Sequence, residues 1–221
     1  QLAESLKKQG YGIIDGFMGV DVAERIREEL LHMHHVGEMK LSELAGGRTG
    51  DNLRYSMAEV RGDVVRFVNG TEKDCQGIGI LRDLSDQVII RVQEKLPELA
   101  GEVIQRGNLM CTCYPGGASK AAPCGRGGPC RYVLHCDNPD KNGRRLTALY
   151  YVNKGWVPEH GGQLRIYPSD ETGRAVGDAV DVDPLFDRFL LFFSDKRCPH
   201  EVMDARAPRY AITTWYYSAE E

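Results

Sequence analysis

Two histidines, one aspartate and one arginine form the most informative set in this chain. His135 and Asp137 are two residues apart, and His200 is followed nine residues later by Arg209. Two imidazoles and a carboxylate can hold Fe(II) on one face and leave three positions open for substrates. The His-x-Asp triplet alone is weak evidence, because a chain with six histidines can contain one by chance. The surrounding residues must therefore support the metal site.

Arg209 suggests how a second molecule is held beside the metal. A 2-oxo acid can chelate a metal through its carboxylate and ketone oxygens and leave one position for O2. A guanidinium group can then hold a distal carboxylate by two parallel hydrogen bonds, which a lysine cannot do. The alternative is that Arg209 pairs with an internal Asp or Glu, since a buried unpaired cation is costly. A structural role also stays open for His200.

The second half of the chain consists of short β-rich runs separated by turn signals. We predict eight strands, at residues 108–114, 131–137, 145–152, 163–167, 179–183, 188–194, 199–203 and 209–217. Eight short strands without helical periodicity between them predict a jelly roll or sandwich. Since residues i and i+2 of a strand point to the same face, His135 and Asp137 project together. Alternate residues from Arg209 to Trp215 share a face for the same reason.

The first half of the chain is predicted to be mainly helical, after a short strand at residues 10–15. Asp21 and Glu24 resemble a capping box, and apolar residues at helical spacing follow them. A second helix is predicted from about residue 78 to residue 95. Three histidines on the first helix are expected at the surface: His32, His34 and His35.

Two polar, glycine-containing segments are predicted to lack regular structure. Residues 46–61 form a long loop between the two helices, which is either functional or a plain surface loop. Residues 116–128 are small, polar and slightly basic, and they form a flexible insert between the first two strands of the second half.

Length and charge limit the classes of protein that fit. A chain of 221 residues fits one domain, with helices and a substrate loop in residues 1–105 and the β core in residues 106–217. The net charge of −4 argues against general nucleic-acid binding. No apolar run approaches the roughly 20 residues of a membrane span. We expect a monomer in the cytoplasm, the nucleus or both, because no secretory signal is present.

The seven cysteines are scattered and include no Cys-x-x-Cys pair. Without a secretory signal we expect all seven to be ordinary thiols. A zinc site is a weaker alternative, built from Cys111, Cys113, Cys124 and Cys130, because their spacing is unconvincing.

Residues 113–220 contain a series of longer motifs. They are CYPG at 113–116, HxDNP at 135–139, YYxNK at 150–154, GGxLRI at 161–166, FDR at 186–188, SDxR at 194–197, PHEV at 199–202 and RYAITxWY at 209–216. This segment resembles the catalytic domain of the hypoxia-inducible-factor prolyl hydroxylases, which are 2-oxoglutarate- and Fe(II)-dependent dioxygenases. The first half is similar more loosely, through RGD at 61–63.

The resemblance implies a mostly β fold, a cupin-like double-stranded β-helix of eight strands in two sheets, braced by helices. It implies Fe(II) at His135, Asp137 and His200. It also implies that the distal carboxylate of 2-oxoglutarate meets Arg209 and Tyr151. The remaining residues of the implied cosubstrate pocket are Tyr114, Leu149, Leu164, Val202 and Thr213.

The resemblance also implies a place for a peptide. Trp215 would lie beside the target proline, Asp63 and Arg144 would pair near the substrate, and residues 46–61 would close over it. The implied activity is 4-hydroxylation of a proline in a degradation motif of a hypoxia-inducible factor α subunit, with O2 and 2-oxoglutarate consumed and succinate and CO2 released. Ascorbate (vitamin C) is expected to support the iron.

Two alternatives stay open at this point. The same chemistry could act on a proline of a translation factor or ribosomal protein, and a non-catalytic β-sandwich binding module is the third possibility. Two departures from the family pattern bear on the peptide. The insert after Gly116 is longer than expected, and Arg145 replaces a small or apolar residue.

Overall fold

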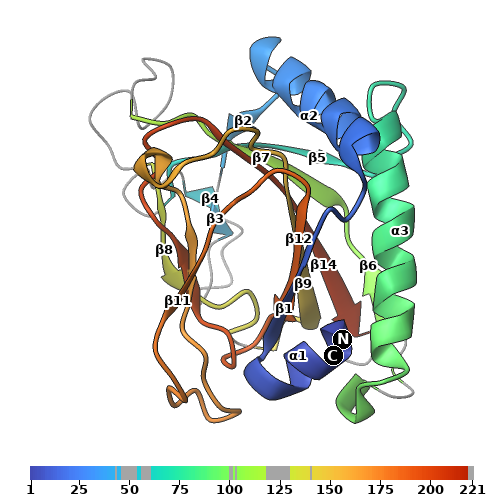
Figure 1. The fold of residues 1–221 in the computed structure, drawn as a ribbon, viewed down its shortest axis with the longest axis vertical. Coiled ribbons are helices and arrows are strands. Elements are labelled where there is room, and N and C mark those ends of the chain that lie inside the picture. The colour runs from blue at the N-terminus through green and yellow to red at the C-terminus, as the bar shows by residue number, and fades with distance from the viewer. Residues whose placement is uncertain are drawn as a thin grey trace.

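Two antiparallel sheets face each other, and helices cover the outer face of the larger one (Figure 1). The computed structural model describes residues 1–42, 44–45, 54–55, 61–99, 102, 104–117, 130–139 and 141–218. Nearly all of the predicted loop at 46–61, and the insert from residue 118 to residue 128, lie outside these ranges.

The larger sheet has eight strands and runs through the middle of the molecule. Its order is β1 (Tyr11–Asp15), β12 (Arg188–Phe193), β9 (Arg144–Tyr151), β14 (Arg209–Ser218), β7 (Leu109–Tyr114), β5 (Val64–Val68) and β2 (Lys40–Leu41), with β6 (Ile104–Arg106) paired to β14. Three of these strands, β1, β2 and β5, come from the half of the chain that was predicted to be mainly helical. They extend the sheet at both edges.

The smaller sheet has four strands and faces the larger one. Its order is β11 (Val180–Val182), β10 (Leu164–Ile166), β13 (His200–Val202) and β8 (Tyr132–His135). A separate two-stranded ladder joins β3 (Leu44–Ala45) to β4 (Arg54–Tyr55). All eight predicted strands of the second half are present, as β7 to β14, and the predicted double-stranded β-helix is confirmed.

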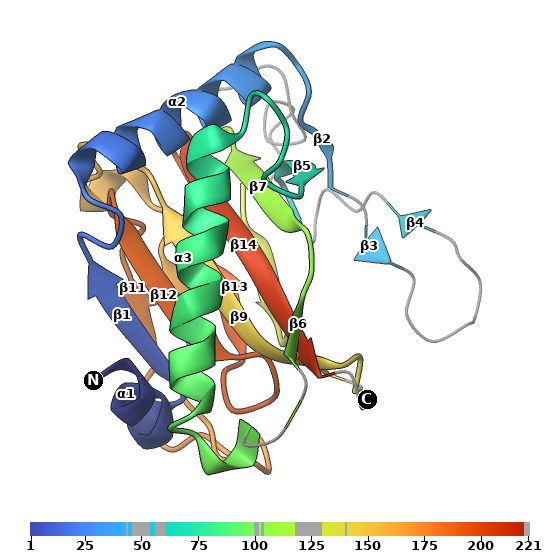
Figure 2. The same ribbon diagram turned by 90° about the vertical axis from the view of Figure 1, so that its right-hand side faces the viewer.

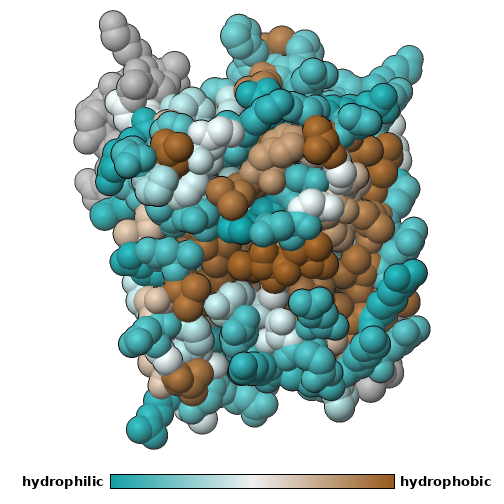
Figure 3. All heavy atoms as spheres, viewed as in Figure 1, coloured by the Kyte–Doolittle hydropathy of each residue, from teal (hydrophilic) through white to brown (hydrophobic). Residues whose placement is uncertain are grey.

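The helices are α1 (Leu2–Gln9), α2 (Val20–His35) and α3 (Gln76–Gln93), with short 3-10 turns at Pro97–Leu99 and Pro158–His160. Figure 2 shows α3 running along the larger sheet, with α2 lying across its upper end. The apolar stripe of α2, Ala23, Ile26, Leu30 and Met33, is buried in the core. In the view of Figure 3, hydrophobic side chains gather in the middle of the face and polar ones surround them.

The predicted capping box on α2 is wrong. The N-cap is Gly19, and Asp21 lies inside the first turn without a side-chain capping bond. Asp21 can still favour this helix end through its charge. The amino end of α3 is capped from another helix, because Glu29 of α2 accepts hydrogen bonds from the backbone N–H groups of Gly77 and Ile78 at 2.7 and 3.0 Å. Sequence spacing along one helix cannot reveal such a contact.

Two further expectations need correction. His34 is half-buried, not a surface residue, because its Nδ1 lies 2.8 Å from the hydroxyl of Tyr210 on the larger sheet. Cys130 is disulfide-bonded, so the expectation of seven thiols is wrong. The spacing of cysteines along the chain does not show which sulfurs the fold brings together. Cys75, Cys111, Cys113, Cys136 and Cys198 are free thiols. None of the described helices is long and apolar enough to cross a membrane.

Candidate metal centre and cosubstrate pocket

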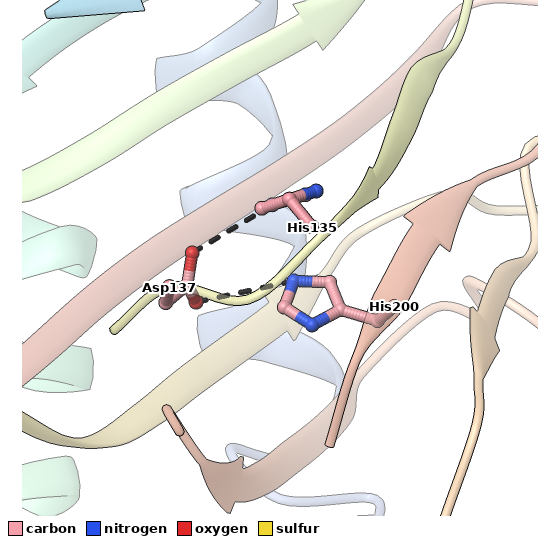
Figure 4. A group of neighbouring side chains, drawn as sticks. All are labelled: His135, Asp137 and His200. Carbon is pink, nitrogen blue, oxygen red and sulfur yellow. Dashed lines mark ion pairs between the residues drawn. The ribbon is translucent and has the colours of Figure 1, made fainter. Parts of the chain in front are cut away.

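His135, Asp137 and His200 converge on one point between the two sheets (Figure 4). His135 ends β8 and His200 begins β13, and antiparallel pairing places them opposite each other. Asp137 follows β8 and turns back toward both rings. Its Oδ1 lies 3.7 Å from Nε2 of His135, and its Oδ2 lies 3.9 Å from Nε2 of His200. The ligand atoms of the three residues all lie within 4.8 Å of one another.

Backbone carbonyls fix the orientation of both imidazoles. Nδ1 of His135 lies 2.8 Å from the carbonyl oxygen of Val133, and Nδ1 of His200 lies 2.9 Å from that of Cys198. A carbonyl only accepts hydrogen bonds, so each Nδ1 carries the proton. Each Nε2 is then left with a lone pair that points toward the centre, as in metal-binding histidines.

Electrostatics favour the protonation states that a metal needs. Burial, together with the nearby ring of His200, lowers the pKa of His135 to about 4. Burial by itself would raise the pKa of Asp137, but His200, His135 and the Thr147 hydroxyl lower it below the ordinary value. At neutral pH, His135 is therefore uncharged and Asp137 is ionised, so neither must lose a proton to bind a cation. This donor set fits Fe(II).

A cavity of about 880 Å³ connects the three residues to a wide opening. Such a volume is at the upper end of ordinary ligand sites and exceeds the needs of one small dicarboxylate. The predicted cosubstrate residues on its wall are Tyr114, Leu149, Leu164, Val202, Arg209 and Thr213. Tyr151 is not on the wall and lies behind Arg209. Trp215 and Arg144 also line the cavity, nearer to the opening.

Arg209 is a buried cation with unused donors. Only 3% of its surface is exposed. Its Nε donates to the carbonyl oxygen of Gly162 at 2.6 Å, and its Nη2 lies 3.4 Å from the Tyr151 hydroxyl. No carboxylate among the described residues forms an ion pair with it, which disfavours the internal Asp or Glu partner. A guanidinium has five N–H donors, so three remain after these two bonds.

Gly162 allows this arrangement because it lacks a side chain. Its φ is +76°, and a Cβ at this position would lie 2.8 Å from Cδ of Arg209. Both tyrosines beside the guanidinium stay protonated, since burial raises the pKa of Tyr114 and of Tyr151. The inner end of the cavity thus offers a fixed cation and phenol groups, which fits the distal carboxylate of a dicarboxylate.

Trp215 and Arg144 form the wall between the metal residues and the opening. The guanidinium of Arg144 lies 4.1 Å from the centre of the Trp215 ring, and its Nη1 donates to the backbone oxygen of Asp137 at 3.2 Å. The indole Nε1 of Trp215 is buried and has no hydrogen-bond partner among the described residues. A buried N–H without a partner is costly, so this atom marks a place where a ligand can accept a hydrogen bond.

The resemblance implied a pair between Asp63 and Arg144, but the structure joins Asp63 to Arg61 instead. Two hydrogen bonds of 2.6 and 2.8 Å link these side chains. Arg61 lies over the Tyr132 ring at 4.7 Å, and Tyr132 stacks on His135 at 3.8 Å between ring centres. Asp63 is buried and is absent from the cavity wall. It therefore acts on the site through Arg61.

Sequence reasoning missed four residues that build this site: Thr147, Gly162, Tyr132 and Arg61. Thr147 could have been found, since it lies two residues before Leu149 on the same strand face. Tyr132 gave no such signal, because the pairing of β8 with β13 is irregular between His200 and Val202. Gly162 is recognisable only from its contact with Arg209.

Comparison with known proteins agrees with this geometry. Residues 122–217 match the family model of the 2OG-Fe(II) oxygenase superfamily. The mouse protein "Prolyl hydroxylase EGLN3" is 38% identical, over 98% of this chain and 82% of its own length. Human "Egl nine homolog 1" is 36% identical, over 98% of this chain and 46% of its own length.

Two solved structures are similar over nearly the whole chain. One is a prolyl hydroxylase from Trichoplax adhaerens in complex with a hypoxia inducible factor oxygen degradation domain peptide fragment. Its TM-score is 0.81 at 33% identity, and the match covers 99% of this chain and 88% of that one. A prolyl-4-hydroxylase from Pseudomonas putida has a TM-score of 0.75 at 21% identity, over 98% of this chain and 97% of that one, which supports the fold alone.

Fold, site and family model together define a 2-oxoglutarate- and Fe(II)-dependent oxygenase. Within that class, the chain belongs to the EGLN family of prolyl hydroxylases.

Proposed function

We propose that this chain hydroxylates C4 of a proline in a degradation motif of a hypoxia-inducible factor α subunit. The overall reaction converts peptidyl proline, 2-oxoglutarate and O2 into peptidyl 4-hydroxyproline, succinate and CO2. The observation that carries the proposal is the buried Arg209, whose spare donors share one cavity with the three metal-type ligands. The similar Trichoplax adhaerens structure, a prolyl hydroxylase in complex with a hypoxia inducible factor peptide fragment, supports the choice of peptide.

The inner end of the cavity is the proposed cosubstrate site. His135, Asp137 and His200 would hold Fe(II), which when bound supplies the reaction of O2 with the 2-oxo acid. Arg209 would hold the distal carboxylate of 2-oxoglutarate, with Tyr151 fixing the guanidinium from behind. The proposed walls around the cosubstrate are Tyr114, Leu149, Leu164, Val202 and Thr213. These mainly apolar side chains keep water away from the reacting atoms.

The outer end is the proposed peptide site. The unpartnered N–H of Trp215 would donate to a backbone carbonyl of the peptide beside the target proline. Arg144 supports the indole by stacking, and Asp63 holds Arg61 at the opposite wall. Phe67 and Leu41 provide apolar surface at the opening. Ascorbate, if it supports turnover, would act by keeping free and bound iron reduced.

Mass spectrometry of competing peptides tests the substrate. The protein is incubated with Fe(II), 2-oxoglutarate and O2 and with an equimolar mixture of peptides. The mixture contains a hypoxia-inducible factor α degradation motif, its proline-to-alanine version, and proline-containing segments of a ribosomal protein and a translation factor. We expect one oxygen atom added to the proline of the first peptide. Preferential oxidation of a ribosomal or translation-factor peptide would reassign the substrate and keep the chemistry.

A non-catalytic binding module is the alternative from another class. Such a module has no need to keep all three metal-type ligands together with a buried arginine that lacks an acidic partner. Binding of the peptide without any 2-oxoglutarate consumption would support it.

A further inference from the structure

The carboxylate of Asp137 receives a hydrogen bond from a buried hydroxyl on the opposite sheet. Oγ1 of Thr147 donates to Oδ2 of Asp137 at 2.7 Å, and Oγ of Ser194 lies 2.8 Å from the same Thr147 oxygen. We propose that Ser194 and Thr147 form a hydroxyl relay that positions Asp137 for the metal. This inference rests on the proposed metal site and concerns two residues outside the three metal-type ligands.

Proton counting fixes the direction of the relay. An ionised carboxylate only accepts hydrogen bonds, so the single proton of the Thr147 hydroxyl points to Asp137. The Thr147 oxygen can then serve Ser194 only as an acceptor. The order is therefore Ser194 O–H to Thr147 O–H to the Asp137 carboxylate. Consecutive hydroxyls that donate in one direction polarise each other, which strengthens the last bond.

Both hydroxyls are held rigidly by the larger sheet. Thr147 is 1% exposed and lies in the middle of β9, opposite Phe192 of β12 and Trp215 of β14. Ser194 is completely buried and directly follows the last residue of β12. The backbone N–H of Ser194 donates to the carbonyl of Arg145 at 3.1 Å, and its carbonyl accepts from Asn138 at 2.8 Å. The relay thus starts from a fixed point next to the metal residues.

The hydrogen bond from Thr147 fixes the rotation of the Asp137 carboxylate, which the other contacts of Asp137 leave free. Asn142 and Arg144 both donate to the backbone oxygen of Asp137, at 2.8 and 3.2 Å, so the main chain is fixed. Among the described residues, the hydrogen bond from Thr147 is the only one that reaches its carboxylate. Because Oδ2 is engaged, Oδ1 is the oxygen that stays unshared and faces Nε2 of His135 at 3.7 Å. Thr147 therefore selects which oxygen Asp137 offers to a cation.

Metal binding without turnover tests this role. Co(II) is titrated into the metal-free protein, and both the dissociation constant and the visible absorption bands of the bound ion are recorded. The variants are Thr147→Val, which keeps the shape and loses the hydroxyl, Thr147→Ser, which keeps the hydroxyl, and Ser194→Ala. Thr214→Val is the matched control. Like Thr147, Thr214 is a buried threonine in a strand, here β14, but it faces away from the cavity.

We expect Thr147→Val to weaken Co(II) binding by about 10- to 100-fold and to change the absorption bands, as is typical when a partner of a metal ligand is lost. Thr147→Ser should stay within about threefold of the wild type, and Ser194→Ala should fall between the two. Thr214→Val should match the wild type in both readouts. A Thr147→Val protein with wild-type affinity and an unchanged spectrum would overturn the relay.

The outcomes separate this inference from the proposed function. If the wild type binds no Co(II), the proposed metal site fails. If the wild type binds Co(II), His200→Ala does not, and Thr147→Val binds as tightly as the wild type, then only the relay fails. Should Thr147→Val not fold, Ser194→Ala decides the question, because it removes a hydroxyl that is two hydrogen bonds away from the Asp137 carboxylate. Wild-type affinity and an unchanged spectrum in a folded Ser194→Ala protein would then contradict the relay.

Discussion

The two ends of the cavity differ in how their polar groups are arranged. At the inner end, His200 and Arg209 are 4% and 3% exposed and each is fixed by a backbone carbonyl. At the opening, Phe67 and Leu41 are 55% and 47% exposed, and the indole N–H of Trp215 has no partner among the described residues. The inner end is preorganised for one small ligand. The opening is left incomplete until a larger ligand covers it.

This difference follows from the elements that build each end. The inner end comes from the paired strands β8, β13, β9 and β14, where hydrogen-bond register leaves little freedom. The opening comes mainly from β2 and β5 at the edge of the larger sheet, in the half of the chain that the family motifs cover only loosely, together with Arg144 of β9 and Trp215 of β14. Variation at the opening can therefore change the peptide without disturbing the metal and cosubstrate.

Removing a metal ligand should have the largest effect. His200→Ala takes away one of three ligands in a buried site, so we expect loss of Co(II) binding and no detectable turnover. His32→Ala, an exposed residue on α2, is the matched control and should behave like the wild type. Full turnover by a folded His200→Ala protein would show that the inner end is not the metal site.

Removing the buried cation should affect one substrate selectively. Arg209→Ala loses two charge-assisted hydrogen bonds to the distal carboxylate, worth about 3 kcal/mol or more, so the KM for 2-oxoglutarate should rise by about 100-fold or more. The KM of Arg209→Lys should lie between that of Arg209→Ala and that of the wild type, because lysine restores the charge but not the two parallel hydrogen bonds. Steady-state kinetics with varied 2-oxoglutarate measures both. An unchanged KM in Arg209→Ala would refute the assigned role.

The indole N–H should matter only for the peptide. Trp215→Phe keeps an aromatic ring against Arg144 and loses the donor, which is worth about 1 kcal/mol, so the KM for the peptide should rise by about fivefold. The KM for 2-oxoglutarate and the Co(II) affinity should not change. If instead the 2-oxoglutarate KM rises and the peptide KM does not, Trp215 belongs to the inner end.

The exposed apolar surface at the opening should give the smallest effect. Phe67→Ala is expected to raise the peptide KM by about threefold, because residues at the rim of an interface contribute little individually. Ile90→Ala on α3 is the control, since Ile90 is also apolar and exposed but is not among the residues that line the cavity. Equal effects of the two substitutions would remove Phe67 from the peptide site.

Strand alternation predicted much of the inner end from the sequence. The eight strands of the second half begin and end within two residues of their expected ends, and Arg209, Ala211, Thr213 and Trp215 share the cavity face as expected. Period-two alternation is a local rule that pairing with neighbours does not disturb. The set of three ligands came from the family resemblance and not from alternation, because Asp137 lies beyond the end of β8 and turns back toward the two histidines.

Contacts between distant segments could not be predicted in this way. The bond from Thr147 to Asp137 crosses from one sheet to the other, and the carbonyl of Gly162 reaches Arg209 from a separate turn. The partner of Asp63 was also misplaced, because Asp63 pairs with Arg61 while Arg144 stacks on Trp215. Such choices depend on packing in three dimensions.

The central claim is that one cavity joins a dioxygenase centre to a peptide proline. Turnover with ¹⁸O₂ tests it most directly, with the two products analysed by mass spectrometry. We expect one labelled oxygen in the 4-hydroxyproline of the peptide and one in succinate, in equal amounts, and neither product from His200→Ala. Labelled succinate without labelled hydroxyproline would contradict the claim, because the inner end would then work without the peptide site.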